Sequence, residues 1–251
     1  FDRNKKSLNF KKRLYKRFKN FSPAKSNCII IFGGDGFMLK NLKKYYRYNK
    51  PFYGINCGTY GFLMNKSNID NLERKILKSK ATTINSLSVN CSYGKGLKKN
   101  LIAVNEISIF RQSKQTASIS ISVGQKQIIK KLIGDGVLVS TPAGSTAYNL
   151  SVNGPILSLN SGKLAITPIS PFRPRRWKGK IISNRSRVKI KNLNSKKRPI
   201  AAVADNVELR NIKSLLIKKN NKINIKLLFD SNKSIVNKIK SEIKRQKSSR
   251  K

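Results

Sequence analysis

The spacing of apolar residues near the start of the chain indicates a helix. Residues 5–20 place Leu8, Leu14, Tyr15 and Phe18 on roughly one face of a 3.6-residue period, with lysines and arginines between them. The pattern predicts a basic amphipathic helix.

Two short apolar runs then predict buried strands. CIIIF at 28–32 and PFYGIN at 51–56 are rich in β-branched and aromatic residues and are short for helices. A helical pattern over 37–48 lies between them. The order strand, glycine-rich turn, helix, strand predicts an open α/β unit with a parallel sheet.

A further helix is predicted over 67–79, where the hydrophobic pattern is again helical. Ser67 or Asn68 is its candidate N-cap, because either side chain can accept a hydrogen bond from a backbone N–H of the first turn.

The pattern changes at about Ile84, where short alternating stretches begin. Turns with glycine, asparagine or proline separate them, which is typical of an antiparallel sandwich or a related β-rich domain. The predicted strands cover 84–91, 101–111, 117–123, 127–133, 136–141, 163–168, 180–183, 186–191, 199–203, 206–209 and 222–229. A basic tail over 234–251 is predicted to begin as a helix.

Composition narrows the chemistry that the chain can perform. No run of about 18 apolar residues and no signal peptide occurs, which predicts a soluble cytoplasmic protein. Three widely spaced cysteines argue against a disulfide framework and a structural zinc site. The absence of histidine excludes a Ser-His-Asp triad and histidine metal ligands. Catalysis must therefore use carboxylates, hydroxyls, amines, backbone groups or a bound metal.

The charge balance makes nucleic-acid binding the first class to consider. The 55 Lys+Arg against 10 Asp+Glu give a formal net charge of +45, which attracts polyanions. The basic residues are spread along the whole chain, however, and occur with abundant asparagine, isoleucine and serine, as an AT-rich coding sequence also produces. The few acidic residues are more informative, because four of the 10 fall in the segments described below: Asp35, Glu106, Asp135 and Asp205.

The first motif is IIIFGGDGFMLK at 29–40. Gly33, Gly34 and Gly36 let the backbone approach a ligand closely, and the N-terminus of the following helix offers N–H groups to phosphate oxygens. The segment is neither a Walker A loop nor a Rossmann fingerprint. The alternative is that Asp35 only caps the helix.

The second motif is GDGVLVSTPAGSTAYNLSVNGP at 134–155. Its glycines, serines and threonines suit a ligand rich in phosphates or riboses, and Tyr148 could stack on a base. The alternative is an ordinary strand–loop–helix connection, although the density of small polar residues around the carboxylate of Asp135 is unusual for one.

The third motif is Asn105-Glu106 within the apolar stretch AVNEISIF. Neighbouring residues of a strand point to opposite faces, so at least one of the two faces something with which it can pair. A glutamate accepts hydrogen bonds from ribose hydroxyls, and an asparagine suits a ribose or an adenine edge. Taken alone, the pair is better explained as two solvent-facing residues at a strand end.

Together these segments resemble the NAD kinase family across nearly the whole chain. The resemblance rests on GGDGFML at 33–39, INCGTYGFL at 55–63, NE at 105–106, the 134–155 segment and ITPISPFRPRRW at 166–177, in the family's order and spacing. GGDG also occurs in 6-phosphofructokinases and diacylglycerol-type lipid kinases. GDG followed by TP-GSTAY is much more specific. ISPFRPR replaces a block that often contains histidine in the family.

The resemblance implies an ATP-dependent transfer of the γ-phosphate to the adenosine 2′-hydroxyl of NAD, giving NADP. Asp35 is then the catalytic proton acceptor, and Gly33, Gly34 and Gly36 bind phosphate. The implied NAD-binding residues are Asp35, Gly36, Asn105, Glu106, Asp135, Thr146, Ala147, Tyr148, Asn149, Leu150, Ser151 and Asn206. Asp205 is an equal alternative to Asn206. Asn105 and Glu106 hold ribose and adenine, and Asp135 contacts the nicotinamide half.

The family fold implies an α/β N-terminal domain over 1–83, joined by the tail 231–251, and a β-rich NAD-binding domain over 84–230. A divalent cation, Mg²⁺ with ATP, and a homodimer or homotetramer are also implied, with no membrane and no specific nucleic acid. Two rivals remain at this point. A lipid kinase shares GGDG but is not expected to carry Asn105-Glu106 or GSTAY, and a nucleic-acid-binding protein leaves the three motifs without a role.

Overall fold

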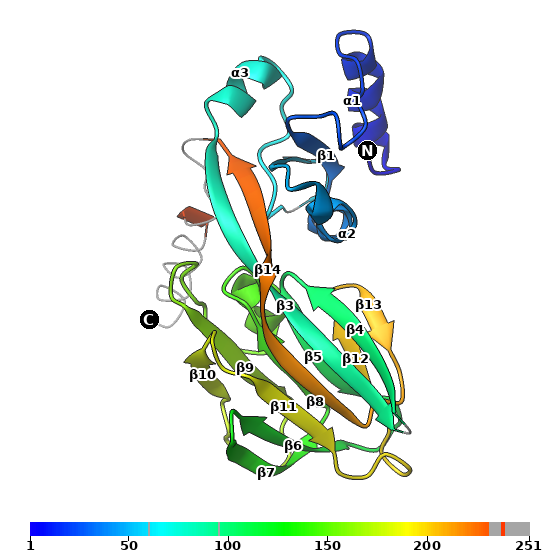
Figure 1. Ribbon diagram of the computed structural model, residues 1–251, viewed down its shortest axis with the longest axis vertical. Coiled ribbons are helices and arrows are strands. Elements are labelled where there is room, and N and C mark those ends of the chain that lie inside the picture. Colours follow the sequence, from blue (N-terminus) through cyan, green and yellow to red (C-terminus); the bar gives the residue numbers. More distant parts are fainter. Residues whose placement is uncertain (60, 95, 231–236, 239–251) are drawn as a thin grey trace. The chain divides into compact units, whose positions relative to one another are not determined.

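The computed structural model describes residues 1–59, 61–94, 96–230 and 237–238, and it divides into two compact units (Figure 1). Unit 1 comprises Phe1–Ile84 and Ile223–Lys251, and unit 2 comprises Asn85–Lys222. Both changes of unit fall inside long strands, β3 (Lys80–Gly94) and β14 (Ser214–Phe229). The predicted domain limits at 83 and 231 stay a proposal, since most of the tail lies outside the described residues.

Unit 1 is built on a small parallel sheet. The helices and strands that form it are α1 (Lys5–Tyr15), β1 (Ile29–Gly33), α2 (Asp35–Tyr45), β2 (Phe52–Asn56) and α3 (Leu72–Leu77). β1 pairs with β2, and β2 pairs with the end of β14, both in parallel. Phe32, Tyr53, Ile55, Leu14 and Leu72 form the core between the sheet and the helices. The predicted α/β unit with a parallel sheet is confirmed.

The N-cap predicted for the third helix is wrong. α3 begins at Leu72, and its N-cap position is Asn71, in the left-handed region with φ of 51° and without a side-chain capping bond. The side chain of Asn68 instead accepts the backbone N–H of Asp70 at 2.7 Å and the ammonium of Lys75 at 2.9 Å. When an asparagine side chain accepts the backbone N–H two residues later in the chain, it forms a turn that competes with helix formation.

The first two helices differ less from the prediction. α1 ends at Tyr15 rather than at residue 20. α2 begins at Asp35, before the predicted residue 37, and a short 3₁₀ helix, η1 (Tyr46–Tyr48), completes the predicted stretch. The early start matters, because it makes Asp35 the first helical residue.

Unit 2 consists almost entirely of antiparallel β-structure. One six-stranded sheet has the order β10-β9-β8-β5-β12-β13, and every pairing in it is antiparallel. Its strands are β5 (Glu106–Arg111), β8 (Gly136–Ser140), β9 (Lys163–Ile169), β10 (Lys180–Ser183), β12 (Ile200–Ala204) and β13 (Val207–Leu209). The rest of unit 2 contains β4 (Leu97–Ala103), β6 (Ala117–Val123), β7 (Lys126–Gly134), β11 (Val188–Asn192) and parts of β3 and β14.

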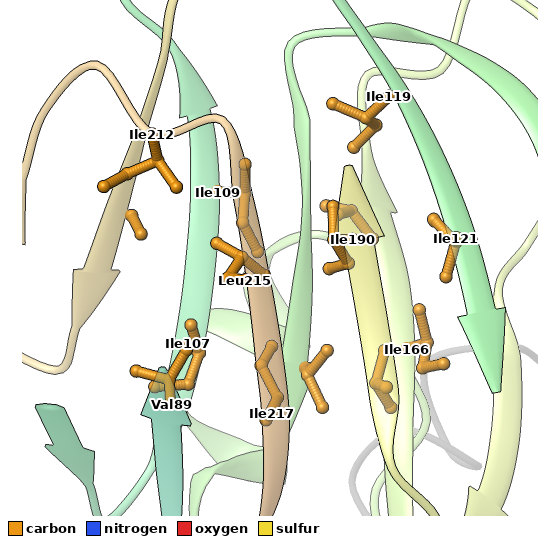
Figure 2. Close-up of a cluster of buried hydrophobic side chains, with 14 of the residues drawn as sticks. Val89, Ile107, Ile109, Ile119, Ile121, Ile166, Ile190, Ile212, Leu215 and Ile217 are labelled. Carbon is orange, nitrogen blue, oxygen red and sulfur yellow. The ribbon is translucent and has the colours of Figure 1, made fainter. Parts of the chain in front are cut away.

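The core of unit 2 collects aliphatic side chains from this six-stranded sheet and from the other strands. Ile107 and Ile109 of β5 and Ile166 of β9 lie in one buried cluster with Ile121 of β6 and Ile190 of β11 (Figure 2). The alternation along β11, where Val188, Ile190 and Asn192 are buried and Lys189 and Lys191 are exposed, turns one face of the strand to this core. The β-rich C-terminal region predicted from the pattern is confirmed.

Several predicted strands have different limits, such as 84–91, which is part of β3 (Lys80–Gly94), and two of the differences change the reading of the chain. The stretch 101–111 is two strands, because β4 ends at Ala103 and β5 begins at Glu106. The strand predicted at 222–229 is the last half of β14, which begins at Ser214. The sequence KKNNK at 218–222 looks like a turn, yet the cross-strand hydrogen bonds of a sheet can keep such a polar stretch extended.

Candidate functional site

Asp35 in unit 1 is held by a distant loop rather than by its own helix. Gly34 occupies the N-cap position of α2, and no side-chain capping bond forms there. The Asp35 carboxylate instead accepts the backbone N–H of Phe62 at 2.6 Å and of Leu63 at 2.9 Å. The alternative that Asp35 only caps the helix is therefore wrong.

The surroundings of Asp35 act on its acidity in opposite directions. Burial raises the pKa of the carboxyl, whereas the N–H groups of Phe62 and Leu63 and the positive charge of Lys238 lower it. The balance leaves the pKa above its usual value, so the carboxylate is a stronger base than an exposed aspartate.

The three glycines around Asp35 have different roles. A Cβ at Gly33 would lie 2.8 Å from the ring of Phe37, so packing requires this glycine. A Cβ at Gly34 or Gly36 would have nothing within 4 Å. None of the three has the positive φ that glycine alone tolerates well. The need for glycine therefore depends on the room for a side chain at each position. Gly34 and Gly36 therefore keep side chains away from the N-terminus of α2, whose backbone N–H groups can bind an anion.

Lys238 is a functional candidate that the sequence did not reveal. Its ammonium donates to the backbone carbonyls of Gly61 at 2.8 Å, Phe62 at 3.0 Å and Met64 at 2.5 Å. One lysine in a tail full of lysines carries no distinguishing pattern, so only the folded chain identifies it.

In unit 2, the turn between β12 and β13 fixes the start of β5. Asp205 has φ of 53°, and its carboxylate accepts the N–H of Val104 at 2.9 Å, Asn105 at 2.8 Å and Glu106 at 3.3 Å. These bonds break the predicted 101–111 strand at Val104 and Asn105. Asp205 thus has a clear structural role, and Asn206 beside it is exposed.

Asn105 and Glu106 are buried, so the explanation as solvent-facing residues is wrong. Each is 8% exposed. Oδ1 of Asn105 and Oε2 of Glu106 have no hydrogen-bond partner among the described residues. Burial, and next the charge of Asp205, raise the pKa of Glu106 to about 8. Buried acceptors without donors are rare in folded proteins, so these two atoms are candidates for ligand contacts.

The loop after β8 packs directly on this pair. The Thr141 hydroxyl donates to the carbonyl of Val104 at 2.8 Å and accepts the N–H of Gly144 at 3.1 Å. A Cβ at Gly144 would lie 2.3 Å from the carbonyl oxygen of Asn105, so no side chain fits there. The small residues of the second motif thus bring its loop against Asn105.

Asn149 stabilises the same loop from inside. Its side chain is fully buried, donates to the carbonyls of Ser145 and Pro155 and accepts the hydroxyl of Thr167 at 2.7 Å. Ser145 likewise bonds to the backbone of Leu157. The Asn149 side chain is committed to the protein, which leaves only its backbone for the predicted NAD contact.

Tyr148, by contrast, lies near two acidic residues of unit 2. Its ring lies 5.8 Å from that of Phe110, centroid to centroid. Burial, and then the charges of Asp135 and Glu106, raise the pKa of its hydroxyl, so both carboxyls are near. Asp135 forms an ion pair with Arg111, a residue that the sequence analysis did not single out. The predicted residues Glu106, Asp135 and Tyr148 are therefore brought together.

The remaining predicted NAD-binding residues follow the same turn, η2 (Gly144–Thr146) and α4 (Tyr148–Ser151). Thr146, Ala147 and Leu150 are partly exposed, and Ser151 is exposed. Within the described ranges, no group of three or more cysteine, aspartate or glutamate side chains is placed to hold a metal. The described helices include none that is long and apolar enough to cross a membrane.

Comparisons with known proteins identify relatives of this chain. Residues 104–214 match the family profile of the ATP-NAD kinase C-terminal domain. The chain is 42% identical to an NAD kinase of Brucella melitensis over 92% of this chain and 90% of that protein. It is 41% identical to an NAD kinase of Rickettsia bellii over 96% of this chain and 95% of that one.

Solved structures show the same fold. The crystal structure of an NAD kinase from Archaeoglobus fulgidus in complex with ATP aligns with a TM-score of 0.73 and 22% identity, over 92% of each chain. Yeast NADH kinase complexed with NADH also aligns with a TM-score of 0.73, at 21% identity over 82% of this chain and 62% of that one.

Proposed function

The chain belongs to the NAD kinase family, and we propose that the residues described above carry out that family's reaction. The enzyme transfers the γ-phosphate of ATP to the 2′-hydroxyl of the adenosine ribose of NAD, which gives NADP. In this proposal Asp35 of unit 1 accepts the hydroxyl proton, and the polar residues of unit 2 bind NAD.

The observation that carries the proposal is the buried pair Asn105 and Glu106. Both have an acceptor atom without a donor among the described residues, which costs free energy until a ligand supplies one. The riboses of NAD offer hydroxyl donors, and its adenine offers an amino group. We therefore assign ribose and adenine recognition to these two side chains, as the family resemblance implies.

The turn that follows β8 completes the proposed NAD pocket. Tyr148 presents a partly exposed ring, and Asp135 lies near it. We assign the further NAD contacts to Thr146, Ala147, Tyr148, Leu150, Ser151, Asp135 and Asn206, with a backbone contact at Asn149. Asp205 has its role in holding the backbone of Asn105, so we favour Asn206 for the ligand.

Asp35 has the properties that a general base needs. A ribose hydroxyl is a poor nucleophile until a carboxylate within hydrogen-bond reach takes its proton. The N–H groups of Phe62 and Leu63 fix the orientation of the carboxylate, and each oxygen keeps a second lone pair for the substrate. The chain has no histidine to share the task.

ATP-dependent transfer also uses a divalent cation, which we propose to be Mg²⁺. Protein sites for Mg²⁺ supply only one or two carboxylates, and substrate phosphates provide other ligands. The described residues fit such an ion, because the open turn at Gly34 and Gly36 leaves room for phosphates, which would provide most of its ligands. When bound, the ion neutralises charge on the phosphate oxygens. Gly34, Gly36 and the α2 N-terminus hold the phosphates.

One incubation separates this function from its rivals. The protein is mixed with ATP, Mg²⁺ and NAD, and NADP is assayed enzymatically, with diacylglycerol replacing NAD in a parallel sample. We expect NADP and no phosphorylated lipid. DNA binding should be weak, independent of sequence and removed by salt. Tight DNA binding at physiological salt without any NADP would overturn the proposal.

We further infer a homodimer or homotetramer that works in the cytoplasm. The family resemblance supports the assembly. The compartment is supported by the use of ATP and NAD and by three cysteines that are all free. Light scattering of the purified enzyme tests the assembly, and a monomer at micromolar concentration would contradict it.

A further inference from the structure

In unit 1, the backbone of the loop after β2 lies between a cation and an anion. On one side the ammonium of Lys238 donates to the carbonyl oxygens of Gly61 at 2.8 Å, Phe62 at 3.0 Å and Met64 at 2.5 Å. On the other side the carboxylate of Asp35 accepts the N–H groups of Phe62 and Leu63.

Two of these carbonyls belong to the same peptide groups as the two N–H donors. The carbonyl of Gly61 and the N–H of Phe62 form one planar group, and the carbonyl of Phe62 and the N–H of Leu63 form the next. Each peptide group therefore accepts from Lys238 at its oxygen and donates to Asp35 at its nitrogen. Hydrogen bonds linked in this way polarise one another and become stronger.

The number of bonds matches what an ammonium can give. Lysine has three N–H donors, and three carbonyls of one short loop accept from Lys238. Lys238 is thus bonded to three peptide groups of the loop, and two of these groups donate their N–H to Asp35.

We propose that Lys238 is a positioning residue for Asp35, acting through the Gly61–Phe62 and Phe62–Leu63 peptide groups. The ammonium fixes both groups and strengthens their N–H donors, so the carboxylate is held in one orientation toward the reacting hydroxyl. The proposal rests on Asp35 as the proton acceptor. Lys238 touches neither substrate in this scheme and takes up no proton.

The test compares three variants of the full-length enzyme. Lys238→Met removes the charge and keeps the length of the side chain, and Lys238→Arg keeps the charge. Lys75→Met is the matched control, because Lys75 also lies in unit 1 and donates to the side chain of Asn68, not to the loop of Asp35. Lys75→Met also removes one positive charge from unit 1, so it controls for the change in net charge.

We expect Lys238→Met to lower kcat about tenfold or more, because a misplaced catalytic group loses much of its effect, while KM for NAD changes far less. The acidic limb of the kcat–pH profile should move to higher pH, since a nearby cation favours the charged carboxylate. Among the described residues, Lys238 is the one charged side chain that acts on the Asp35 pKa. Lys238→Arg should restore most of kcat, and Lys75→Met should resemble the wild type.

Amide NMR gives a readout that does not depend on activity. In Lys238→Met the amide proton signals of Phe62 and Leu63 should shift upfield as their hydrogen bonds weaken, with Lys75→Met unchanged. If Lys238→Met matches Lys75→Met in kcat, pH profile and both amide shifts, the inference is wrong. Should Lys238→Met unfold, the same amide shifts and pH profile are read in Lys238→Gln.

Failure of this inference can be told apart from failure of the assigned base. If Asp35→Asn is nearly inactive while Lys238→Met behaves as the wild type, Asp35 remains the base and only the role of Lys238 is refuted. If folded Asp35→Asn keeps its kcat, the base assignment fails, and the role of Lys238 fails with it. If the wild type forms no NADP, the proposed function itself is refuted.

Discussion

Asp35 in unit 1 and Glu106 in unit 2 are both largely buried carboxyls, but their surroundings differ. Asp35 accepts two backbone N–H groups and has a lysine behind the same loop. Glu106 has an oxygen without a donor in the described part of the chain, and Asp205 lies nearby with a like charge. Asp35 is therefore organised before substrate arrives, whereas Glu106 needs hydroxyl donors from the ligand. This difference suits the roles proposed for them, a general base for Asp35 and a ligand-binding residue for Glu106.

The largest expected effect is that of Asp35→Asn. Asparagine cannot accept the proton, so kcat should fall by roughly 10²–10⁴-fold, the usual contribution of positioned proton transfer. NAD binding measured by calorimetry should survive, because the loss falls on the transition state.

Asp230→Asn is the control for that experiment. Asp230 accepts the hydroxyl of Tyr53 at 2.6 Å in the same unit, and an asparagine oxygen can still accept it. Since an amide also disturbs one of the bonds from Phe62 and Leu63, thermal melting of Asp35→Asn must be measured alongside the rate. A folded Asp35→Asn enzyme with near wild-type kcat would move the catalytic assignment to Asp135.

Glu106→Ala should act on NAD binding instead. Hydrogen bonds to a charged acceptor contribute about 1.5–3 kcal/mol, so KM for NAD should rise by one to two orders of magnitude, with a smaller change in kcat. Steady-state kinetics at varied NAD measures the change, and Glu208→Ala, an exposed glutamate of unit 2, is the control. Unaltered NAD kinetics in a folded variant would show that Glu106 does not contact the ligand.

Asp205→Asn should weaken the hydrogen bonds that hold the backbone at Val104, Asn105 and Glu106. Three backbone N–H groups donate to the Asp205 carboxylate, and an amide offers only one acceptor oxygen. Leaving a buried donor unpaired costs about 1–3 kcal/mol of unfolding free energy, measurable by urea denaturation. The pKa of Glu106 should also fall below about 8, since a like charge is removed. Stability equal to that of Glu208→Gln would contradict this role.

The smallest expected effect concerns pH. The pKa of Glu106 is about 8 in the folded chain against 4.5 in the reference state, so its contribution to stability is full below pH 4.5 and lost as pH rises through 8. Glutamine does not titrate. As the pH rises from 4.5 to about 8, the Tm of Glu106→Gln should therefore increase relative to that of the wild type.

NAD should reduce this pH dependence, because ribose hydroxyls donate to the charged carboxylate and lower its pKa. Scanning calorimetry across the window, with and without NAD, measures both trends. In the described part of the chain, Asp205 and Tyr148 are ionisable groups that interact with Glu106, and Asp205→Asn tests the contribution of Asp205. A Tm difference that does not vary with pH would contradict the raised pKa.

The sequence alone determined the elements with strong patterns. The short apolar run of β1 and the strict alternation of β6 predict strands rather than helices. The order of the motifs indicates the family. The sequence also singled out Asp35, Glu106, Asp135 and Tyr148, because glycine-rich turns and lone acidic residues in a basic chain are conspicuous.

Only the tertiary structure decided what these residues do. The division of 101–111 into two strands depends on Asp205, which lies about a hundred residues further along the chain. The burial of Asn105 and Glu106, the ion pair of Arg111 with Asp135 and the three bonds of Lys238 are likewise long-range contacts. Local periodicity predicts which face of a helix or strand is apolar. It does not predict which distant backbone group contacts a given side chain. The hydrogen bonds, the burial and the pKa values of these side chains depend on such long-range contacts, so they can be determined only in the folded chain.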